Sequence, residues 1–464
     1  MQALQFIQSI PRYALTKAMG VVSCHAFWGP LSPLQLRNVS APELPGPQWA
    51  RVRTRFGGIC GSDLHTILLQ TSPSLSGLVS FPFTLGHENV GVVTEVGPQV
   101  RGFAGGERVV AEPLLSCVPR GLEPCPACRR GERSRCICFA EGALSPGIGI
   151  GGCSSTGGSW GDSFVAHESQ LYRVPAAVSD ENALLLEPFC VALRPVRRNL
   201  PSDQDVALVL GAGTIGLCVI AALRACGSRA RIVVAARYPF QAELATRLGA
   251  DEVLIPPRGA TVEALAPLLG GKLRHPLMGQ PLVLGGAPWV FECAGSRESL
   301  DAALRLCGPG GSVVLLGLAA VPKDLDWTPI WLKEINVRGT FWCSEELEGG
   351  RRVSTFRLAL EWLAEGRLDL SPLLTHRLPP GARRDDSERQ VQGGQVGIRL
   401  PMRPDANHDD KQLTAAYEPP RTLLATPPAH CLGAGHVGAA DKTCRRGAAG
   451  VPPPARPRFA GPTQ

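Results

Sequence analysis

The chain has 464 residues, of which 44% are hydrophobic and 19% charged, and a formal net charge of +7. This length allows two or three domains with substantial cores, and the composition is typical of a folded globular protein rather than a disordered one. About +3 of the charge falls in residues 401–464, with eight Lys/Arg against five Asp/Glu, so the body is only mildly basic. We therefore expect no nucleic-acid partner.

Neither a targeting signal nor a membrane span is predicted. Residues 1–6 lack a basic region followed by an unbroken apolar run, and no later stretch reaches about 18 uninterrupted apolar residues. We expect a cytoplasmic protein with no membrane partner. Of the sixteen cysteines, four cluster between Cys117 and Cys136 and most others stand singly in apolar segments, which favours metal binding and reduced core thiols over disulfides.

Residues 1–115 consist of short β-type runs, such as 49–54 and 90–97, broken by Gly and Pro. This pattern predicts a small, irregular β-barrel-like domain. Within it, a thiol, a hydroxyl, a carboxylate and an imidazole fall within six residues, and a second imidazole and carboxylate follow at 87 and 88. Thiolate, imidazole and carboxylate are zinc ligands, so the two fragments together indicate a catalytic metal site. The residues concerned are Cys60, Ser62, Asp63, His65, His87 and Glu88.

The sequence GICGSDLH at 58–65, followed by GHE at 86–88, resembles the zinc-dependent medium-chain alcohol dehydrogenase family. The nearest branch is that of sorbitol, threonine and related polyol dehydrogenases, and the resemblance extends to about Leu370. It implies a GroES-like β-rich catalytic domain and a Rossmann cofactor domain. It also implies that Ser62 takes the proton of the substrate hydroxyl, that His65 carries it toward solvent, and that Asp63 supports His87 as a zinc ligand.

Four cysteines match the family's structural-zinc lobe, in which four thiolates close a tetrahedral site. The core of the match is Cys125, Cys128 and Cys136, in the spacing C-x2-C-x7-C. Cys117 lies eight residues before Cys125 instead of the family's usual three, so a longer loop must fold back to complete the site. Cys138 is the alternative fourth ligand. A tract of free surface thiols is the less favoured interpretation, because exposed thiols oxidise.

Residues 139–162 are rich in Gly and Ser and predict a loop before a strand at 163–166. Glu187 then ends an apolar run, where an unpaired carboxylate would be costly to bury and a metal would relieve that cost. In the polyol-dehydrogenase branch this Glu-Pro element approaches the catalytic zinc. We therefore expect Cys60, His87 and either Glu88 or Glu187 to bind the zinc. The alternative is that Glu187 only caps the following helix.

The cofactor domain has the clearest pattern. An apolar strand at 206–210 leads into G-x-G-x-x-G at 211–216, a helix at 217–225 and a second strand at 231–235. This is the βαβ context in which glycines let the backbone approach a pyrophosphate at a helix N-terminus. Strands at 289–293 and 312–316, with a helix at 297–307, extend a doubly wound parallel sheet. The expected cofactor-binding residues are Gly211, Gly213, Thr214, Ile215 and Gly216.

The end of the second strand predicts the choice of cofactor. An NAD site of this type normally has Asp or Glu about twenty residues after the glycine motif. Here Ala236 occupies that position and is followed by Arg237 and Tyr238. Because a guanidinium pairs with a 2′-phosphate, we expect NADP to be preferred over NAD. The alternative is that Arg237 is a solvated residue at a strand end.

The remaining segments carry less information. Residues 256–288 form a long connection with a helix-like piece at 262–269, and a helix at 355–364 returns the chain to the catalytic domain. Residues 396–400 predict a final strand, whereas 401–464 hold eleven prolines and predict disorder. We also hypothesise that a shifted reading frame generated this end. The expected domains are 1–190 (catalytic, with the structural-zinc lobe at 117–138), 191–343 (cofactor), 344–404 (return to the catalytic domain) and 405–464 (disordered tail).

Together these patterns predict a zinc-dependent dehydrogenase that moves a hydride between an alcohol or polyol and NAD(P). A homo-oligomer is expected from the family resemblance alone. Two alternatives are a zinc-free reductase of the same superfamily, which the intact Cys60, His87 and Glu88 argue against, and a nucleotide-binding protein without turnover.

Overall fold

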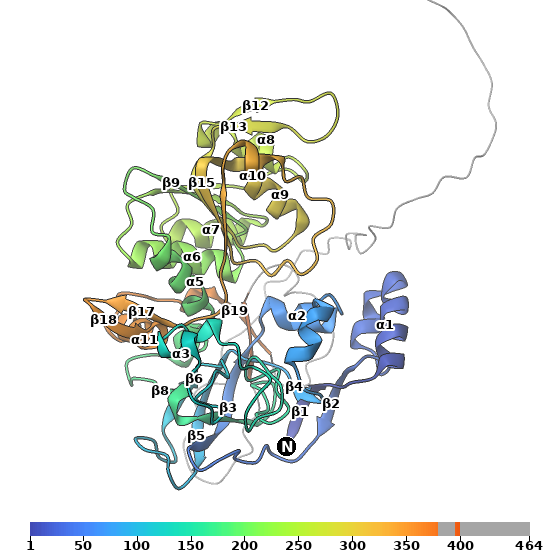
Figure 1. Ribbon diagram of the computed structural model, residues 1–464, viewed down its shortest axis with the longest axis vertical. Coiled ribbons are helices and arrows are strands. Elements are labelled where there is room, and N and C mark those ends of the chain that lie inside the picture. The colour runs from blue at the N-terminus through green and yellow to red at the C-terminus, as the bar shows by residue number, and fades with distance from the viewer. Residues whose placement is uncertain (379–394, 400–464) are drawn as a thin grey trace, which may run out of the picture. The chain divides into compact units, whose positions relative to one another are not determined.

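A computed structural model of the chain describes residues 1–378 and 395–399, and the statements below concern these residues (Figure 1). None of the helices in these ranges is long and apolar enough to cross a membrane. The predicted disordered tail and most of 379–404 lie outside the described residues.

The β-rich part is built on two sheets. In the larger sheet, β3 lies at the centre and pairs with β5, β7 and β20, while β6 and β8 extend the β5 side and β19 extends the β20 side. Apolar residues of β3, β5, β6 and β7 form its core. Its strands are β3 (Trp49–Gly58), β5 (Asn89–Val96), β6 (Arg108–Ala111), β7 (Ser163–His167), β8 (Leu171–Arg173), β19 (Leu374–Leu378) and β20 (Gln395–Arg399). The smaller sheet holds β1 (Gln2–Phe6), β2 (Leu34–Asn38) and β4 (Phe83–Thr84) in the order β2-β1-β4.

The cofactor part is a six-stranded parallel sheet in the order β11-β10-β9-β14-β15-β16. Its central strands are apolar and buried on both faces, as parallel sheets require. Ala207 and Val209 of β9 pack toward α5, α6 and α7, whereas Leu208 and Leu210 pack toward α8 and α9. The strands are β9 (Val206–Leu210), β10 (Arg231–Ala235), β11 (Glu252–Leu254), β14 (Ala287–Glu292), β15 (Cys307–Leu315) and β16 (Asn336–Gly339). The doubly wound fold is thereby confirmed.

Most predicted helices form close to their expected bounds. The helices are α1 (Ile10–Val22), α2 (Gly61–Ile67), α3 (Pro126–Arg129), α4 (Asp180–Leu184), α5 (Leu186–Arg198), α6 (Thr214–Ala225), α7 (Pro239–Arg247), α8 (Thr261–Leu265), α9 (Arg297–Leu306), α10 (Thr328–Leu332) and α11 (Thr355–Ala364). Six short 3-10 turns join them, at Cys24–Trp28, Pro73–Leu78, Arg133–Arg135, Glu168–Gln170, Pro267–Leu269 and Ser371–Leu373. The long connection at 256–288 contains α8 and an antiparallel hairpin of β12 (Lys272–Arg274) and β13 (Leu282–Leu284).

No helix was predicted in residues 1–115, yet α1 and α2 lie in this range of the β-rich domain. Helix α1 occurs in the connection between β1 and β2, two strands that pair antiparallel from Gln2↔Asn38 to Phe6↔Leu34. Its start is encoded locally. Ser9 is the N-cap and its hydroxyl accepts a hydrogen bond from the Arg12 N–H, while Pro11 occupies the first turn, where no backbone donor is needed.

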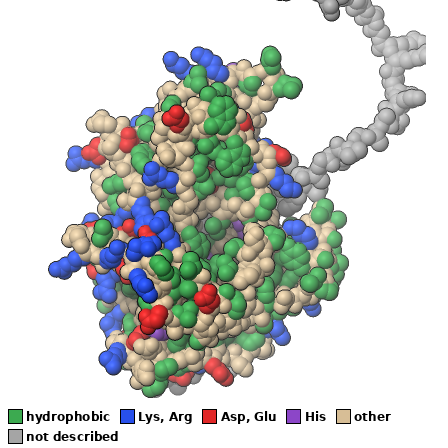
Figure 2. All heavy atoms as spheres, in the orientation of Figure 1, with side chains coloured by type: hydrophobic (Ala, Val, Ile, Leu, Met, Phe, Trp, Pro, Cys, Tyr) green, Lys and Arg blue, Asp and Glu red, His purple; other side chains and the backbone are tan. Residues whose placement is uncertain are grey.

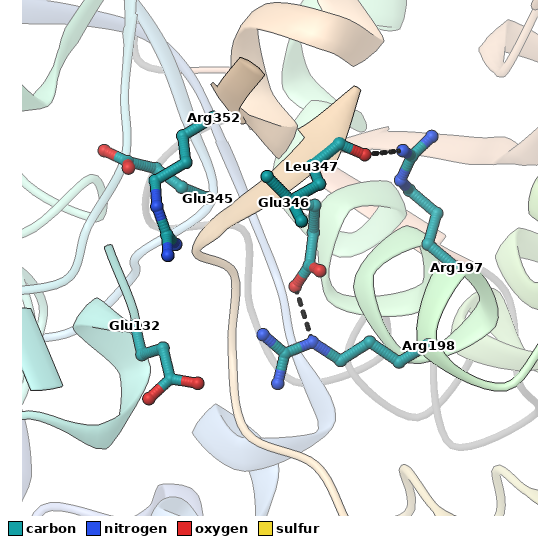
Figure 3. Close-up of a pocket in the computed structure, with 7 residues that line it drawn as sticks. All are labelled: Glu132, Arg197, Arg198, Glu345, Glu346, Leu347 and Arg352. Atoms are coloured by element: carbon teal, nitrogen blue, oxygen red, sulfur yellow. Dashed lines mark hydrogen bonds and ion pairs between the residues drawn. The ribbon is translucent and has the colours of Figure 1, made fainter. Parts of the chain in front are cut away.

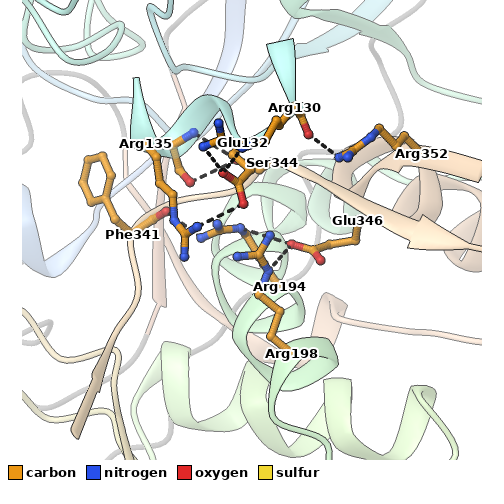
Figure 4. Close-up of polar contacts among 10 residues, drawn as sticks. Arg130, Glu132, Arg135, Arg194, Arg198, Phe341, Ser344, Glu346 and Arg352 are labelled. Carbon is orange, nitrogen blue, oxygen red and sulfur yellow. Dashed lines mark hydrogen bonds and ion pairs between the residues drawn. The ribbon is translucent and has the colours of Figure 1, made fainter. Parts of the chain in front are cut away.

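A charged junction fixes the cysteine-rich lobe and α5 to the hairpin of β17 (Glu345–Glu348) and β18 (Arg351–Ser354). Glu346 of β17 pairs with Arg194 and Arg198 of α5 (Figure 4). Arg352 of β18 donates to the Arg130 carbonyl of the lobe, where Glu132 pairs with Arg130 and Arg135. A surface pocket of about 350 Å³ lies here, and its three arginines are matched by three glutamates (Figure 3). With its charges balanced, this pocket is a salt-bridged junction, and it positions the helix that carries Glu187.

Candidate metal centres and cofactor site

The two chemical fragments of the β-rich part meet in space. Cys60 follows β3 as the N-cap of α2, and His87 and Glu88 immediately precede β5, which pairs with β3. Ligand atoms of Cys60, His87 and Glu88 all lie within 4.8 Å of one another. The register of two adjacent strands therefore brings a thiol, an imidazole and a carboxylate to one point.

Asp63 supports this cluster from α2. Its Oδ2 accepts a hydrogen bond of 2.9 Å from the Cys60 N–H, and its Oδ1 lies 3.8 Å from His87 Nδ1. Burial raises the pKa of the Asp63 carboxyl, an effect that His87 and the backbone N–H groups of Cys60 and Gly86 oppose. The carboxylate thus lies where it can orient the His87 ring, as carboxylates do beside metal-binding histidines.

Glu88 is held in place by close packing. The carboxylate is buried, and a Cβ added at Gly58 would lie 1.9 Å from Glu88 Oε2, so only glycine fits there. The loop at 139–162, which carried no predicted chemistry, supplies a second layer. Ser159 Oγ donates to the Glu88 carbonyl at 2.7 Å, and Trp160 Nε1 donates to the Gly58 carbonyl at 2.7 Å. Sequence spacing gives no signal for contacts of this range.

Glu187 lies near the cluster but not in it. It occupies the first turn of α5 and is buried. In the described chain, however, the ligand atoms that all lie within 4.8 Å of one another belong to Cys60, His87 and Glu88, and Glu187 is not among them. Burial raises the pKa of Glu187, and the charge of His87 lowers it. Trp342, which the sequence did not single out, packs edge-on against the His87 ring with centroids 5.7 Å apart.

The buried acidic groups around His87 would be stabilised in their ionised forms by a bound cation. Burial alone would lower the pKa of His87, but Asp63, Cys60 and Glu187 raise it well above the usual value. Burial raises the pKa of the Cys60 thiol; His87 opposes this effect, and Glu88 and Asp63 add to it. A divalent cation would hold these acidic groups in their ionised forms and leave His87 neutral, so the donor set fits zinc.

Ser62 and His65 lie one turn apart on α2, beside Cys60. Both are half-buried, and burial lowers the pKa of His65, so this ring is a neutral hydrogen-bonding group near pH 7. No hydrogen bond joins the Ser62 hydroxyl to the His65 ring in the described residues. The predicted proton path is supported by their common helix alone.

The cysteine lobe brings together the four predicted sulfurs. Cys117, Cys125, Cys128 and Cys136 lie within 4.8 Å of one another, whereas Cys138 is not in the group. The Cys125 N–H donates to Cys117 Sγ at 3.3 Å. Burial opposes the Cys125 thiolate, but the N–H groups of Cys128 and Ile137 lower its pKa to about 6. Four sulfurs with backbone donors and no open position fit a closed structural zinc site.

Arg120 explains how the lengthened loop before Cys125 folds back. The side chain is fully buried, and it donates all of its N–H groups to backbone carbonyls and none to a carboxylate. The acceptors are the carbonyls of Leu115 (3.0 Å), Glu141 (2.8 Å), Leu144 (3.3 Å), Ser145 (3.2 Å) and Gly147 (2.6 Å). Burial lowers the Arg120 pKa, and the charges of nearby cysteines, Cys117 and Cys136 among them, raise it. The guanidinium is therefore the buried cation beside the thiolate cluster.

The glycine turn has the geometry of a dinucleotide site. Gly211 has a φ of 96°, which favours glycine, and a Cβ at Gly216 would lie 1.8 Å from the Gly211 carbonyl oxygen. A Cβ at Gly213 would meet no atom within 4 Å, so the backbone is open to a ligand there. Thr214 and Ile215 begin α6 directly after it, so the glycine turn leads straight into a helix N-terminus, where pyrophosphate groups bind in dinucleotide sites.

Arg237 and Tyr238 follow β10 beside this turn. Gln241 Oε1 accepts from the Arg237 N–H at 3.1 Å, which fixes the start of α7. The Arg237 guanidinium is exposed and lies 5.6 Å from the Tyr238 ring centroid. It forms no ion pair with any carboxylate of residues 1–378, so its charge is available to a ligand.

Comparisons with known proteins agree with this geometry. Residues 46–176 match the alcohol dehydrogenase GroES-like domain, and residues 214–365 match the zinc-binding dehydrogenase domain. The chain is 31% identical over 337 residues to sorbitol dehydrogenase of Arabidopsis thaliana, covering 72% of this chain and 82% of that protein. It is 30% identical over 349 residues to L-idonate 5-dehydrogenase of Vitis vinifera, covering 74% and 84%.

A solved structure, 2R,3R-butanediol dehydrogenase from Bacillus subtilis, is 25% identical to the chain with a TM-score of 0.59, covering 79% of this chain and 96% of that one. Matches over both domains, a relative above 30% identity and a common fold point to one origin. The chain therefore belongs to the zinc-dependent medium-chain alcohol dehydrogenase family and is an oxidoreductase that uses zinc and a nicotinamide cofactor.

Proposed function

We propose that the protein oxidises an alcohol or polyol hydroxyl at the Cys60 cluster, with NADP⁺ as the hydride acceptor. The observation that carries this proposal is the convergence of Cys60, His87 and Glu88 within 4.8 Å. A zinc-free reductase would have no need for this buried donor set. The relatives named sorbitol and L-idonate 5-dehydrogenase support a polyol as the substrate class.

We propose that Cys60, His87 and Glu88 hold the catalytic zinc and that Glu187 exchanges with one of them or with water. When bound, zinc supplies Lewis-acid polarisation that lowers the pKa of an alcohol hydroxyl. The Ser62 hydroxyl then accepts the substrate proton and His65 passes it toward solvent, a task that its lowered pKa suits because the ring must be neutral to receive it. Asp63 keeps the His87 ring oriented.

For the structural site we propose Cys117, Cys125, Cys128 and Cys136 as the ligands. For the cofactor, Gly211, Gly213 and Gly216 with the first turn of α6 support binding of the pyrophosphate. Arg237, unpaired in the described residues, supports contact with a 2′-phosphate, to which Tyr238 would add a hydroxyl donor. NADP preference follows from this charge.

We also propose a homo-oligomer in the cytoplasm, organised as the domains 1–190, 191–343 and 344–404. The edge strand β16 is exposed along its length, and Trp327 and Trp331 are exposed beside it. An unprotected edge with large apolar neighbours supports pairing with another copy. Sedimentation equilibrium of the zinc-loaded protein tests the assembly, and subcellular fractionation tests the location.

The activity is tested with a panel of alcohols, polyols and hydroxy amino acids, each assayed with NADP⁺ and with NAD⁺ by reduced-nicotinamide absorbance. We expect turnover of at least one polyol, with the higher kcat/KM for NADP⁺. Cofactor binding by a fully zinc-loaded protein without turnover of any panel member would favour the nucleotide-binding alternative. Equal kcat/KM values for the two cofactors would contradict the role of Arg237.

A further inference from the structure

Helix α1 has the reverse of the usual polarity of a surface helix. Three residues at spacing four, Arg12, Thr16 and Gly20, face the rest of the protein, and all three are polar or small. The outward surface is almost entirely apolar: Ile10 is 80% exposed, Val21 60% and Val22 88%. The other exposed residues of the helix are Pro11, Tyr13, Ala14, Leu15, Lys17, Ala18 and Met19. Exposure of such an apolar surface to water is unfavourable in free energy unless something covers it.

The helix is firmly placed on the fold. The Lys17 ammonium donates to the Leu69 carbonyl at 2.7 Å, and Arg12 Nη1 donates to the Pro30 carbonyl at 2.7 Å. A Cβ at Gly20 would collide with the Phe27 ring, so the inward face has no room to rotate. The region where α1 lies, at the right of Figure 1, is covered mainly by hydrophobic side chains in the space-filling view (Figure 2).

This element is separate from the dehydrogenase machinery. It lies in the connection between β1 and β2, at residues 7–33, whereas the family domains match residues 46–176 and 214–365. Antiparallel neighbours such as β1 and β2 can be joined by about two to five residues. Neither the paired strands nor the catalytic domain therefore accounts for the helix.

The charged residues in the first 42 positions of the chain, which include α1, all have one sign. The first acidic residue of the chain is Glu43, whereas Arg12, Lys17 and Arg37 all precede it. None of these three pairs with a carboxylate in the described residues. A surface pocket of about 470 Å³ lies beside the helix and holds Arg12 and Arg37 without any carboxylate; its other lining residues are Ile7, Gln8, Gln35, Phe81 and Pro82.

We propose that α1 is an interfacial helix that binds the surface of a bilayer containing anionic phospholipid. Its outward apolar side chains enter the boundary between head groups and acyl chains. Lys17 and Arg37 contact lipid phosphates, and the pocket bordered by Arg12 and Arg37 receives a head group. This departs from the expectation of no membrane partner, which rested on the lack of a spanning segment.

Helix size favours a bilayer over a second copy of the chain. Thirteen residues make a helix about 20 Å long and 10 Å wide, a footprint of roughly 200 Å². A stable protein interface buries about 800 Å² on each partner. An interfacial helix needs only its own apolar face, and the absence of Asp and Glu from residues 1–42 suits an anionic surface.

The test is co-sedimentation of the full-length, zinc-loaded protein with vesicles of phosphatidylcholine alone or with added phosphatidylserine. We expect binding to the anionic vesicles only, weakened by salt. Leu15→Gln with Val22→Gln should weaken binding about a hundredfold, since each side chain loses its apolar burial. Lys17→Gln with Arg37→Gln should weaken it about tenfold. Leu277→Gln with Met278→Gln, at exposed positions elsewhere, is the matched control and should bind like the parent.

Two further measurements separate the outcomes. Turnover should be unchanged in all three double variants, because none of the residues lies at the catalytic or cofactor site. The melting temperature should be unchanged in the Leu15/Val22 and Leu277/Met278 variants, whereas loss of the Lys17 hydrogen bond to the Leu69 carbonyl should lower it slightly in the Lys17/Arg37 variant. Failure of the parent to bind anionic vesicles would overturn the proposal. So would equal binding by the Leu15/Val22 variant, or a fall in oligomer mass in that variant, which would make α1 a subunit contact instead.

Discussion

Replacement of Arg120 by Met should destabilise the protein although Arg120 is remote from the reaction. Methionine keeps the length of the side chain but removes the charge and all five hydrogen bonds to carbonyls. A hydrogen bond from a charged donor contributes about 1.5–3 kcal/mol, so the gross loss is several kcal/mol. Removal of the buried charge offsets part of it, and loss of one partner in a buried ionic site typically costs about 3–5 kcal/mol.

We therefore expect Arg120→Met to lower the melting temperature by about 5–10 °C and to speed release of one zinc to a chelator. Arg120→Lys keeps the charge but not the planar fork of donors, so it should fall between Met and the parent. Arg129→Met, at an exposed position of the same lobe, is the control and should change stability by less than about 0.5 kcal/mol. Scanning calorimetry and chelator kinetics measure both effects. If Arg120→Met behaved like Arg129→Met, the guanidinium would have no structural role.

Three other predictions concern cofactor binding and pH. Gly216→Ala should weaken NADP binding at least about tenfold and also lower the melting temperature, because its Cβ would lie 1.8 Å from the Gly211 carbonyl oxygen. Gly213→Ala should weaken NADP binding without a loss of stability, because its Cβ would meet no protein atom within 4 Å. Titration of cofactor fluorescence and calorimetry check this pair, and unchanged stability of Gly216→Ala would contradict the close approach. Ala236→Asp with Arg237→Ile should shift preference toward NAD by about 1.5–3 kcal/mol in relative kcat/KM, and no shift would assign 2′-phosphate recognition to another residue. Burial lowers the pKa of Lys333 to about 8, below its value in the unfolded chain, so the folded state binds fewer protons than the unfolded state between about pH 8 and 10.5. The free energy of unfolding of the parent should therefore rise with pH in this range relative to that of Lys333→Met, by at most about 1.4 kcal/mol per pH unit. Parallel pH profiles in urea unfolding would show that Lys333 keeps an ordinary pKa.

Local sequence patterns predicted the helices and strands that apolar periodicity and capping residues encode. The strand at 231–235 and the helix at 355–364 form with the predicted bounds, because apolar periodicity and capping residues encode them. The final strand forms at Gln395–Arg399, one residue from its predicted position. Helix α1 was missed although Ser9 and Pro11 encode its start, because apolar residues lie on most sides of residues 10–22 and give no clear helical period.

For the metal sites too, the sequence predicted what local patterns encode and missed what depends on long-range contacts. Ligand types and the family resemblance grouped Cys117 with Cys125, Cys128 and Cys136 despite its unusual spacing, with Cys138 as the alternative. The first four sulfurs do lie together, and their binding of zinc stays a prediction. Sequence could not decide between Glu88 and Glu187, because the choice depends on how α5 packs against the strand pair. Nor could it predict Arg120, Ser159, Trp160 or Trp342, whose roles depend on contacts between segments far apart in the chain.

The central claim, that one chain holds an open catalytic zinc and a closed structural one, is tested most directly by zinc stoichiometry. We predict two zinc ions per chain in the fully loaded parent, one for each ligand group. Cys60→Ser should retain one zinc, lose turnover and keep the parent's melting temperature, whereas Cys128→Ser should retain one zinc and melt at a lower temperature. At most one zinc in the fully loaded parent, or full turnover in Cys60→Ser, would contradict the account.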